Sequence, residues 1–243
     1  MQTVLYAFLA GLSTVAGVGI LALFGKPGPK VLAGLLSFAG GIMIAISFFE
    51  LLPDAVHHGS LRLTLAGFSV GMLFLYRVDE LLPRNAEGGE TGTLSAAQLR
   101  RSGYLVLAGI GLHNLPEGLA IGAGLEASPQ LGLALTLAIA LHNLPEGIAI
   151  AAPLHAAGEP LKKIALLTLA AGMLTPVGAV LGLLLFRLSG AFVGAGMAFA
   201  AGAMVYIALS ELLPKGNALH PPVAKPAMNA ALVLSFLMAL NAS

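Results

Sequence analysis

Residues 38–53 read FAGGIMIAISFFELLP, and residues 199–214 read FAAGAMVYIALSELLP. Nine of these sixteen positions are identical, and they align without a gap. The two stretches lie in the second and the seventh of eight apolar segments, so a chain that crosses a membrane at every segment carries them in opposite directions. This pattern predicts an inverted-topology repeat, which is typical of transporters, although two helices can also share an origin without sharing a function.

The composition of the chain places it in a lipid bilayer. Apolar residues make up 58% of the 243 residues, whereas Asp, Glu, Lys and Arg make up only 9%. A soluble domain carries about 25% charged residues, so this chain lacks the charge to hydrate a soluble surface. It contains no cysteine, which excludes disulfides and thiolate metal sites. It also has no basic run interleaved with aromatic residues, so we expect no nucleic-acid partner.

A transmembrane helix needs roughly 20 apolar residues. We therefore predict an all-α integral membrane protein with one domain over residues 1–243, arranged as 3+2+3 helices. The N-terminal residues carry no positive charge, so the first segment is expected to be a retained helix and not a signal peptide. The predicted helices span residues 4–24, 31–52, 61–82, 103–125, 131–154, 161–187, 190–213 and 223–241.

The distribution of Lys and Arg predicts the orientation in the membrane. Ten of the twelve lie in or beside the loops that follow the first, third, fifth and seventh helices, and only Arg62 and Arg187 lie on the other side. We therefore expect both termini to face outward and the linker 84–102 to be cytoplasmic. The ten are Lys26, Lys30, Arg77, Arg84, Arg100, Arg101, Lys162, Lys163, Lys215 and Lys225.

A second repeat carries the chemistry. Residues 111–122 read GLHNLPEGLAIG, and residues 140–151 read ALHNLPEGIAIA. The two motifs fall near the centres of consecutive, antiparallel helices, so both are expected at the same membrane depth. Because residues four apart share one helix face, each helix offers an imidazole and a carboxylate side by side. The pairs are His113 with Glu117, and His142 with Glu146.

Two imidazoles and two carboxylates around one point suit a divalent first-row cation such as zinc, iron(II), manganese or cobalt. Calcium and magnesium prefer oxygen ligands. Asn114 and Asn143 can add amide oxygens or orient the ligands. Each carboxylate near the bilayer centre costs at least ~2.5–3.5 kcal/mol, which a bound dication offsets. A neutral network of hydrogen-bonded His and Glu is the structural alternative, and a matched pair of motifs makes it the weaker one.

Three further residues are candidates. Met43 lies mid-helix in the first copy of the long repeat, where a core-facing or lipid-facing role is the ordinary alternative to a ligand role. Glu50 and Glu211 occupy equivalent positions of that repeat, at its predicted outer and inner ends. They are candidates for the entrance and the exit of a transport pathway, or simply for hydrated helix ends.

Paired HNLPEG motifs in the fourth and fifth of eight helices resemble the ZIP (Zrt/Irt-like protein) family of metal transporters, in particular its compact bacterial ZupT-type members. The resemblance implies import of zinc, iron, manganese, cobalt or cadmium ions across a bacterial inner membrane by alternating access. It implies no resident cofactor, and it implies assembly as a homodimer. The matching ligand positions are His113, Asn114, Glu117, His142, Asn143 and Glu146, with Met43 at a further position used in some bacterial members.

The sequence departs from the family pattern in two places. Many bacterial members have a Glu directly before the Pro of the sixth helix, where Thr175 precedes Pro176 here. We therefore expect one principal metal site and not a binuclear one. The linker 84–102 contains no histidine, so metal sensing through that loop is not expected.

Two other functions fit the same ligands. An intramembrane metal-dependent hydrolase also needs His and carboxylate groups at membrane depth, but the zinc-protease pattern H-E-x-x-H is missing. We therefore expect a protein that is not an enzyme. A metal-selective channel remains an alternative, because carrier and channel can use the same ligand set.

Overall fold

The computed structural model describes residues 2–81, 94–127, 129–185 and 190–242. All regular elements in these residues are helical, which confirms the predicted all-helical class. The elements are α1 (Gln2–Phe24), α2 (Pro29–Ile46), η1 (Ser47–Leu51), α3 (Leu52–His58), α4 (Leu61–Leu81), α5 (Ala96–Ala127), α6 (Pro129–Ala156), α7 (Leu161–Gly172), α8 (Leu174–Leu185), α9 (Gly190–Ile207), η2 (Ala208–Leu212), α10 (Leu213–Leu219) and α11 (Pro221–Ala242).

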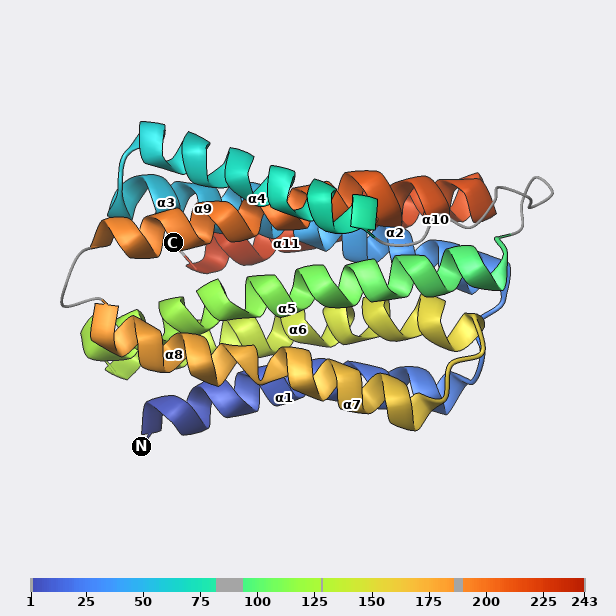
Figure 1. Ribbon diagram of the computed structural model, residues 1–243, viewed down its shortest axis with the longest axis horizontal. Coiled ribbons are helices and arrows are strands. Elements are labelled where there is room, and N and C mark those ends of the chain that lie inside the picture. The colour runs from blue at the N-terminus through green and yellow to red at the C-terminus, as the bar shows by residue number, and fades with distance from the viewer. Residues whose placement is uncertain (1, 82–93, 128, 186–189, 243) are drawn as a thin grey trace.

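The helices form two groups that lie side by side along their whole length (Figure 1). We call α1, α5, α6, α7 and α8 the motif bundle, because α5 and α6 carry the two HNLPEG motifs. We call α2, η1, α3, α4, α9, η2, α10 and α11 the repeat bundle, because it carries both copies of the long repeat. The two bundles meet mainly where α5 packs on α9 and where α2 packs on α6.

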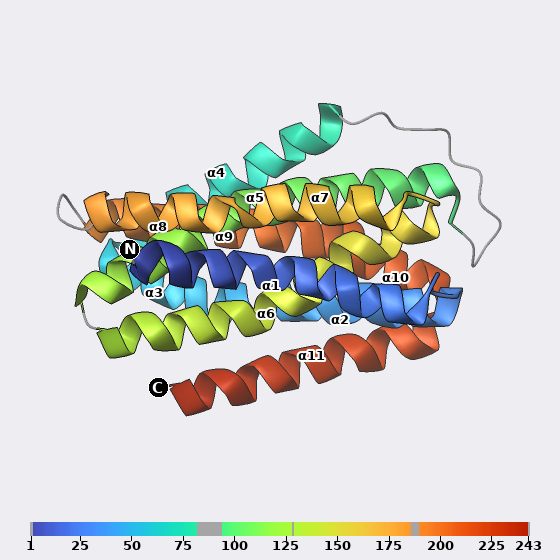
Figure 2. The ribbon, with the colours of Figure 1, turned by 90° about the horizontal axis from the view of Figure 1, so that it is seen from below.

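Each half of the chain contributes a matching set of elements to both bundles. The bounds of α2, η1 and α3 recur as those of α9, η2 and α10, at the same offset along the chain as the long repeat. The two copies run in opposite directions along the molecule, and α1 begins at the end where α11 finishes (Figure 1). The packing matches as well, because α9 pairs with α4 as α2 pairs with α11, and α4 and α11 lie at opposite edges of the molecule (Figure 2).

A proline explains the local π-helix in each copy of the repeat. Pro53 and Pro214 lack the N–H that an α-helix needs at that position, and the chain absorbs the defect by widening the preceding turn. The N–H of Leu52 therefore donates to Ser47, five residues back, and the N–H of Leu213 donates to Ala208 in the same way. π-Segments of this kind are often found at functional sites, and each one here carries a glutamate.

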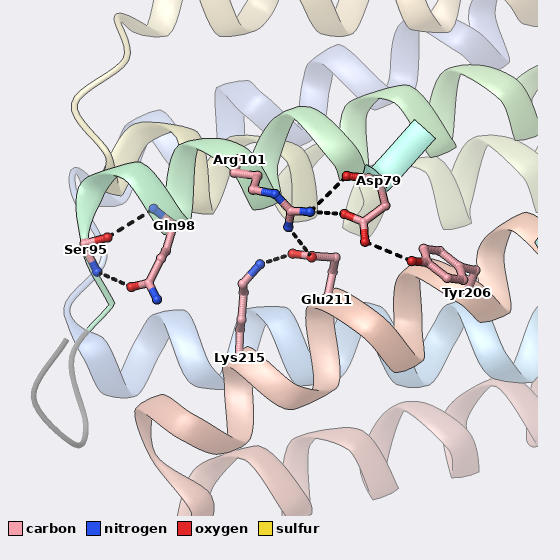
Figure 3. A network of polar contacts seen from close by, with 7 residues as sticks. All are labelled: Asp79, Ser95, Gln98, Arg101, Tyr206, Glu211 and Lys215. Atoms are coloured by element: carbon pink, nitrogen blue, oxygen red, sulfur yellow. Dashed lines mark hydrogen bonds and ion pairs between the residues drawn. The ribbon is translucent and has the colours of Figure 1, made fainter. Parts of the chain in front are cut away.

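The helix that contains the first HNLPEG motif begins earlier than the sequence analysis predicted. α5 starts at Ala96 instead of residue 103, so the last part of the predicted linker 84–102 is helical, and residues 82–93 lie outside the described residues. A capping box fixes this start, as Figure 3 shows. The Ser95 hydroxyl accepts from the Gln98 N–H at 3.2 Å, and the Gln98 side chain accepts from the Ser95 N–H at 2.9 Å.

The sixth predicted helix, 161–187, is interrupted and forms α7 and α8. Pro176 has no N–H to donate to the carbonyl of Gly172, four residues back, so the α-helix ends at Gly172 and restarts at Leu174. The carbonyl of Gly172 lies close against α1, because a Cβ atom added at Gly11 would come within 2.1 Å of its oxygen. The interruption therefore helps α1 to approach α7 closely.

Seven helical segments of the described residues are long and apolar enough to span a membrane. The eighth predicted span, 223–241, forms the 22-residue helix α11 but is not among the seven. The side chains of residues 238–243 lie outside the described part of the structure, which leaves only residues 221–237 of this helix described with their side chains. A membrane protein with several spans is therefore supported, and eight crossings stay a prediction.

Candidate metal centre

Three buried acid and imidazole side chains meet inside the motif bundle. His113 and Glu117 come from α5, and Glu146 comes from α6. Each is at most 2% exposed, and their potential ligand atoms all lie within 4.8 Å of one another. The spacing of four residues puts His113 and Glu117 on one face of α5, and the packing of α6 on α5 brings Glu146 opposite them.

The distances within this cluster suit a cation better than a set of hydrogen bonds. The Nε2 atom of His113 lies 3.0 Å from Oε1 of Glu117 and 3.0 Å from Oε1 of Glu146. One ring nitrogen cannot aim a single N–H at two oxygens. Among the described residues, neither carboxylate oxygen of Glu146 is aligned for a hydrogen bond, although buried polar atoms nearly always have one. A ring nitrogen and two carboxylates in this arrangement can coordinate a first-row divalent metal ion.

The asparagine of each motif is anchored on a backbone carbonyl of a neighbouring helix. The Nδ2 atom of Asn114 donates to the carbonyl of Ala171 in α7 at 3.0 Å. The Nδ2 atom of Asn143 donates to the carbonyl of Ala10 in α1, also at 3.0 Å. Both side chains are fully buried, and their Oδ1 atoms accept no hydrogen bond from a described residue. The anchored amides therefore hold two carbonyl oxygens available for a ligand.

The anchoring carbonyls belong to a further repeat that the sequence analysis missed. Residues 10–17 read AGLSTVAG and residues 171–178 read AGMLTPVG, with four identical positions out of eight at the same offset as the long repeat. Ala10 and Ala171, which receive the two asparagines, are equivalent in this alignment. The signal was present in the sequence at that offset, but small residues in an apolar helix draw little attention without a contact to explain them.

Glycines in both motifs let the supporting helices touch backbone to backbone. A Cβ atom added at Gly118 of α5 would lie 1.9 Å from the carbonyl oxygen of Thr175 in α8. A Cβ atom added at Gly147 of α6 would lie 1.8 Å from the carbonyl oxygen of Thr14 in α1. Small residues allow such approaches between membrane helices. Because each glycine directly follows a candidate ligand, Glu117 or Glu146, the same contacts fix the position of the carboxylates.

The prolines of the motifs add polar groups at the same level. Pro116 and Pro145 lie inside α5 and α6, and neither has an N–H to donate to the carbonyl four residues back. The carbonyls of Leu112 and Leu141 therefore lose their usual intrahelical donor. At membrane depth such groups are tolerated where they line a cavity or meet a ligand.

The other predicted site residues lie in different settings. His142 belongs to α6, but its side chain is outside the described part of the structure. Met43 is buried in α2, in the repeat bundle. Glu50 lies in η1 and Glu211 lies in η2, at equivalent positions of the two copies of the long repeat. Glu50 is half-buried, whereas Glu211 is 4% exposed and is paired with Arg101 and Lys215.

Known proteins resemble this chain over most of its length. A family model described as "ZIP Zinc transporter" matches residues 82–240. The zinc transporter ZupT of Chlorobaculum parvum is 36% identical over an alignment that covers 88% of each chain. The zinc transporter GufA of Myxococcus xanthus is 39% identical, with 74% of this chain and 72% of the relative covered. ZupT of Escherichia fergusonii is 36% identical, with 88% and 86% covered. The chain described here belongs to the ZIP family.

Proposed function

We propose that this chain carries divalent transition-metal cations, with zinc as the principal substrate, across a bacterial inner membrane into the cytoplasm. The observation that carries the proposal is the buried cluster of His113, Glu117 and Glu146. Relatives named zinc transporters support the choice of metal. Family membership also argues against the intramembrane hydrolase, because the relatives are named as transporters and not as enzymes.

We assign the ligand set to both motifs. His113, Glu117 and Glu146 supply one nitrogen and two carboxylates, and His142 is expected to supply a second nitrogen from α6. The Oδ1 atoms of Asn114 and Asn143 complete the set or hydrogen-bond to water on the metal. We assign Met43, which is buried in α2 of the repeat bundle, as a further and softer ligand. A nitrogen and oxygen site of this kind selects transition metals over calcium and magnesium.

The transport step follows from the division into two bundles. The described cluster lies entirely in the motif bundle, so that bundle can move as a body and take the ion with it. Eight crossings with both termini outward put the η1 end outside and the η2 end in the cytoplasm. The ion then enters past Glu50 and leaves past Glu211. Alternating access by rocking of one bundle against the other around the binding site is the general behaviour of inverted-repeat transporters.

The test is metal uptake into proteoliposomes that contain a fluorescent chelator. The parent protein is compared with His113→Ala and Glu146→Gln, and with Glu80→Gln as a control, because Glu80 is exposed at the end of α4. We expect saturable zinc uptake by the parent and the control. We also expect metal affinity to fall about a hundredfold or more in the two site variants, since even residues that only hydrogen-bond to metal ligands contribute about 10–100-fold.

The same assay separates the competing functions. A parent protein that binds one ion tightly but gives no flux with any metal contradicts the transporter. Flux that does not saturate, together with unitary currents in a planar bilayer, favours the channel. A panel of zinc, iron(II), manganese, cobalt and cadmium then measures selectivity at the same site.

A further inference from the structure

A network of ion pairs joins the two bundles at the η2 end of the molecule (Figure 3). Arg101 of α5 reaches across from the motif bundle to three acceptors in the repeat bundle. One guanidinium nitrogen pairs with Oε1 of Glu211 in η2 at 3.1 Å. The other pairs with the carboxylate of Asp79 in α4 and also donates to the Asp79 carbonyl at 3.1 Å.

Both acids are held by a second group within the repeat bundle. Lys215, one turn along from Glu211, pairs with its other carboxylate oxygen. The hydroxyl of Tyr206 in α9 donates to Oδ2 of Asp79 at 2.9 Å. The acids are therefore fixed in place, and Arg101 is the member of the network that comes from the other bundle. Its side chain is 17% exposed, and those of Asp79 and Glu211 are 11% and 5% exposed.

Partly buried charges of this kind make separation of the bundles costly. Moving the motif bundle away from α4 and η2 has to expose both acids and the guanidinium together. Removing one partner of a buried pair is more harmful than replacing both, because the remaining charge is left uncompensated. The network therefore behaves as a contact that is either made or broken, which is the kind of element that separates two discrete conformations.

We propose that Arg101 is an ionic latch that holds the motif bundle against the repeat bundle at the η2 end and keeps the path from the metal centre to that end closed. The latch rests on the proposed transport function, in which the two bundles move apart at each end in turn. It assigns a conformational role to Arg101, Asp79 and Glu211, and it requires no metal ligation by any of them. The latch opens when the motif bundle moves; Lys215 then still pairs with Glu211, and Tyr206 still donates a hydrogen bond to Asp79.

The neighbouring residue Arg100 provides a matched control. It lies on the same helix and pairs with Glu159 at 2.9 Å, but Glu159 belongs to the connection between α6 and α7 and so to the same bundle as Arg100. Loss of Arg100 removes one guanidinium and one ion pair without affecting the contact between bundles. The comparison of Arg101→Gln with Arg100→Gln therefore isolates the crossing contact.

Separation of the bundles can be measured with a single engineered cysteine, because the chain has none of its own. Ile207 of α9 is 1% exposed and packs on Gly109 of α5, its Cδ1 lying 1.7 Å from the place where a Gly109 Cβ would be. Gly109 lies on α5 between Arg101 and His113. The rate of alkylation of Ile207→Cys by a hydrophilic maleimide in lipid nanodiscs, where both ends are open to the reagent, reports how often this interface opens.

In the Ile207→Cys background we expect Arg101→Gln to raise the alkylation rate on the order of tenfold, since charges in one network couple by factors of this size. Arg100→Gln should leave the rate at the parental value. The neutral pair Arg101→Gln/Asp79→Asn should also react rapidly, because it lacks the latch but has no uncompensated Asp79 charge. If Arg101→Gln does not fold, Arg101→Lys takes its place. Lysine keeps the charge but lacks the two guanidinium nitrogens that pair with Asp79 and Glu211, so it should give a smaller increase in the alkylation rate.

Several outcomes overturn the latch. Equal rates for Arg101→Gln and the parent contradict it, and so does an equal increase for Arg100→Gln. A double variant that returns to the parental rate assigns the effect to an unpaired charge and not to a lost contact. The measurement needs no transport, so a protein that moves metal but shows no change in alkylation refutes the latch alone. A protein that moves no metal refutes the proposed function by a separate assay.

Discussion

Replacing Gly118 by alanine tests the backbone contact that holds Glu117 in place. The added Cβ would lie 1.9 Å from the carbonyl oxygen of Thr175, 2.8 Å from the amide nitrogen of Ala179 and 2.9 Å from the Cα of Gly178. An ordinary C···O contact is about 3.4 Å, so α5 and α8 have to separate by about 1.5 Å. All three neighbours are backbone atoms, so no side-chain rotation relieves the clash.

The energetic consequence is the difference between two opposed effects. Overpacking of this kind costs about 3 kcal/mol, at the upper end of the usual range, because backbone has to move. Alanine recovers about 1 kcal/mol of helix propensity relative to glycine. A net loss of about 2 kcal/mol corresponds to a decrease in Tm of about 4–8 °C for a chain of this size. The measurement is thermal unfolding of the purified protein in detergent.

Gly19→Ala is the control, because a Cβ at Gly19 of α1 meets nothing within 4 Å. It gains the helix propensity without the clash, so its Tm should rise by about 2–4 °C. Opposite signs for the two glycines support close contact between α5 and α8. A Gly118→Ala protein that is as stable as Gly19→Ala would refute the reasoning.

Three further outcomes can be measured. Zinc affinity at equilibrium should fall at least about tenfold between pH 7.5 and 5.5, because the imidazoles must be neutral to bind metal and the reference imidazole titrates near 6.5; unchanged affinity contradicts the ligand set. Metal titration should give one central ion per chain, and Thr175→Glu, which places an acid at a fully buried position beside the motifs, should raise this to two. A hydrogen bond from Lys163 holds the pKa of Glu159 below its usual value, with Arg100 adding to the effect. The ionised Glu159 therefore stabilises the fold at pH values above the pKa of this group in the unfolded chain, and this stabilisation is lost as the pH falls through the lower pKa of the folded chain. Glu159→Gln should accordingly lower Tm slightly at pH 7 and leave it unchanged near pH 3.

Periodicity and repetition made the framework predictable. Apolar length predicted the helices, and the constant offset between the two copies of the long repeat indicated two opposed halves before any contact was known. The spacing of four between His113 and Glu117 was enough to put them on one face, and the structure brings Glu146 to them. The all-helical class and the family are confirmed, while the ligand roles, the eight crossings and the outward termini stay predictions.

The features that the sequence analysis missed depend on local hydrogen bonding or on partners far along the chain. The start of α5 at Ala96 is coded by a four-residue capping box, which hydropathy does not detect. Pro176 was visible, but an interruption of the helix at that point depends on where the freed carbonyl can go. The anchoring of Asn114 on Ala171 spans 57 residues, and that of Asn143 on Ala10 spans 133. No pattern within one helix indicates which carbonyl an amide will find.

The two halves of the chain agree in shape but differ in charge, and this difference bears on how the protein moves. Asn114 and Asn143 are anchored alike, and η1 and η2 are equivalent segments. If the halves were identical, the conformations open at either end would have equal free energies. Lys215 follows Glu211 by one helical turn, whereas the equivalent position after Glu50 carries Asp54. The two ends therefore attract cations differently. A difference of only ~1.4 kcal/mol changes the ratio of two conformations tenfold. A latch at the η2 end that contributes this much is sufficient to favour the conformation closed there until a bound ion changes the balance.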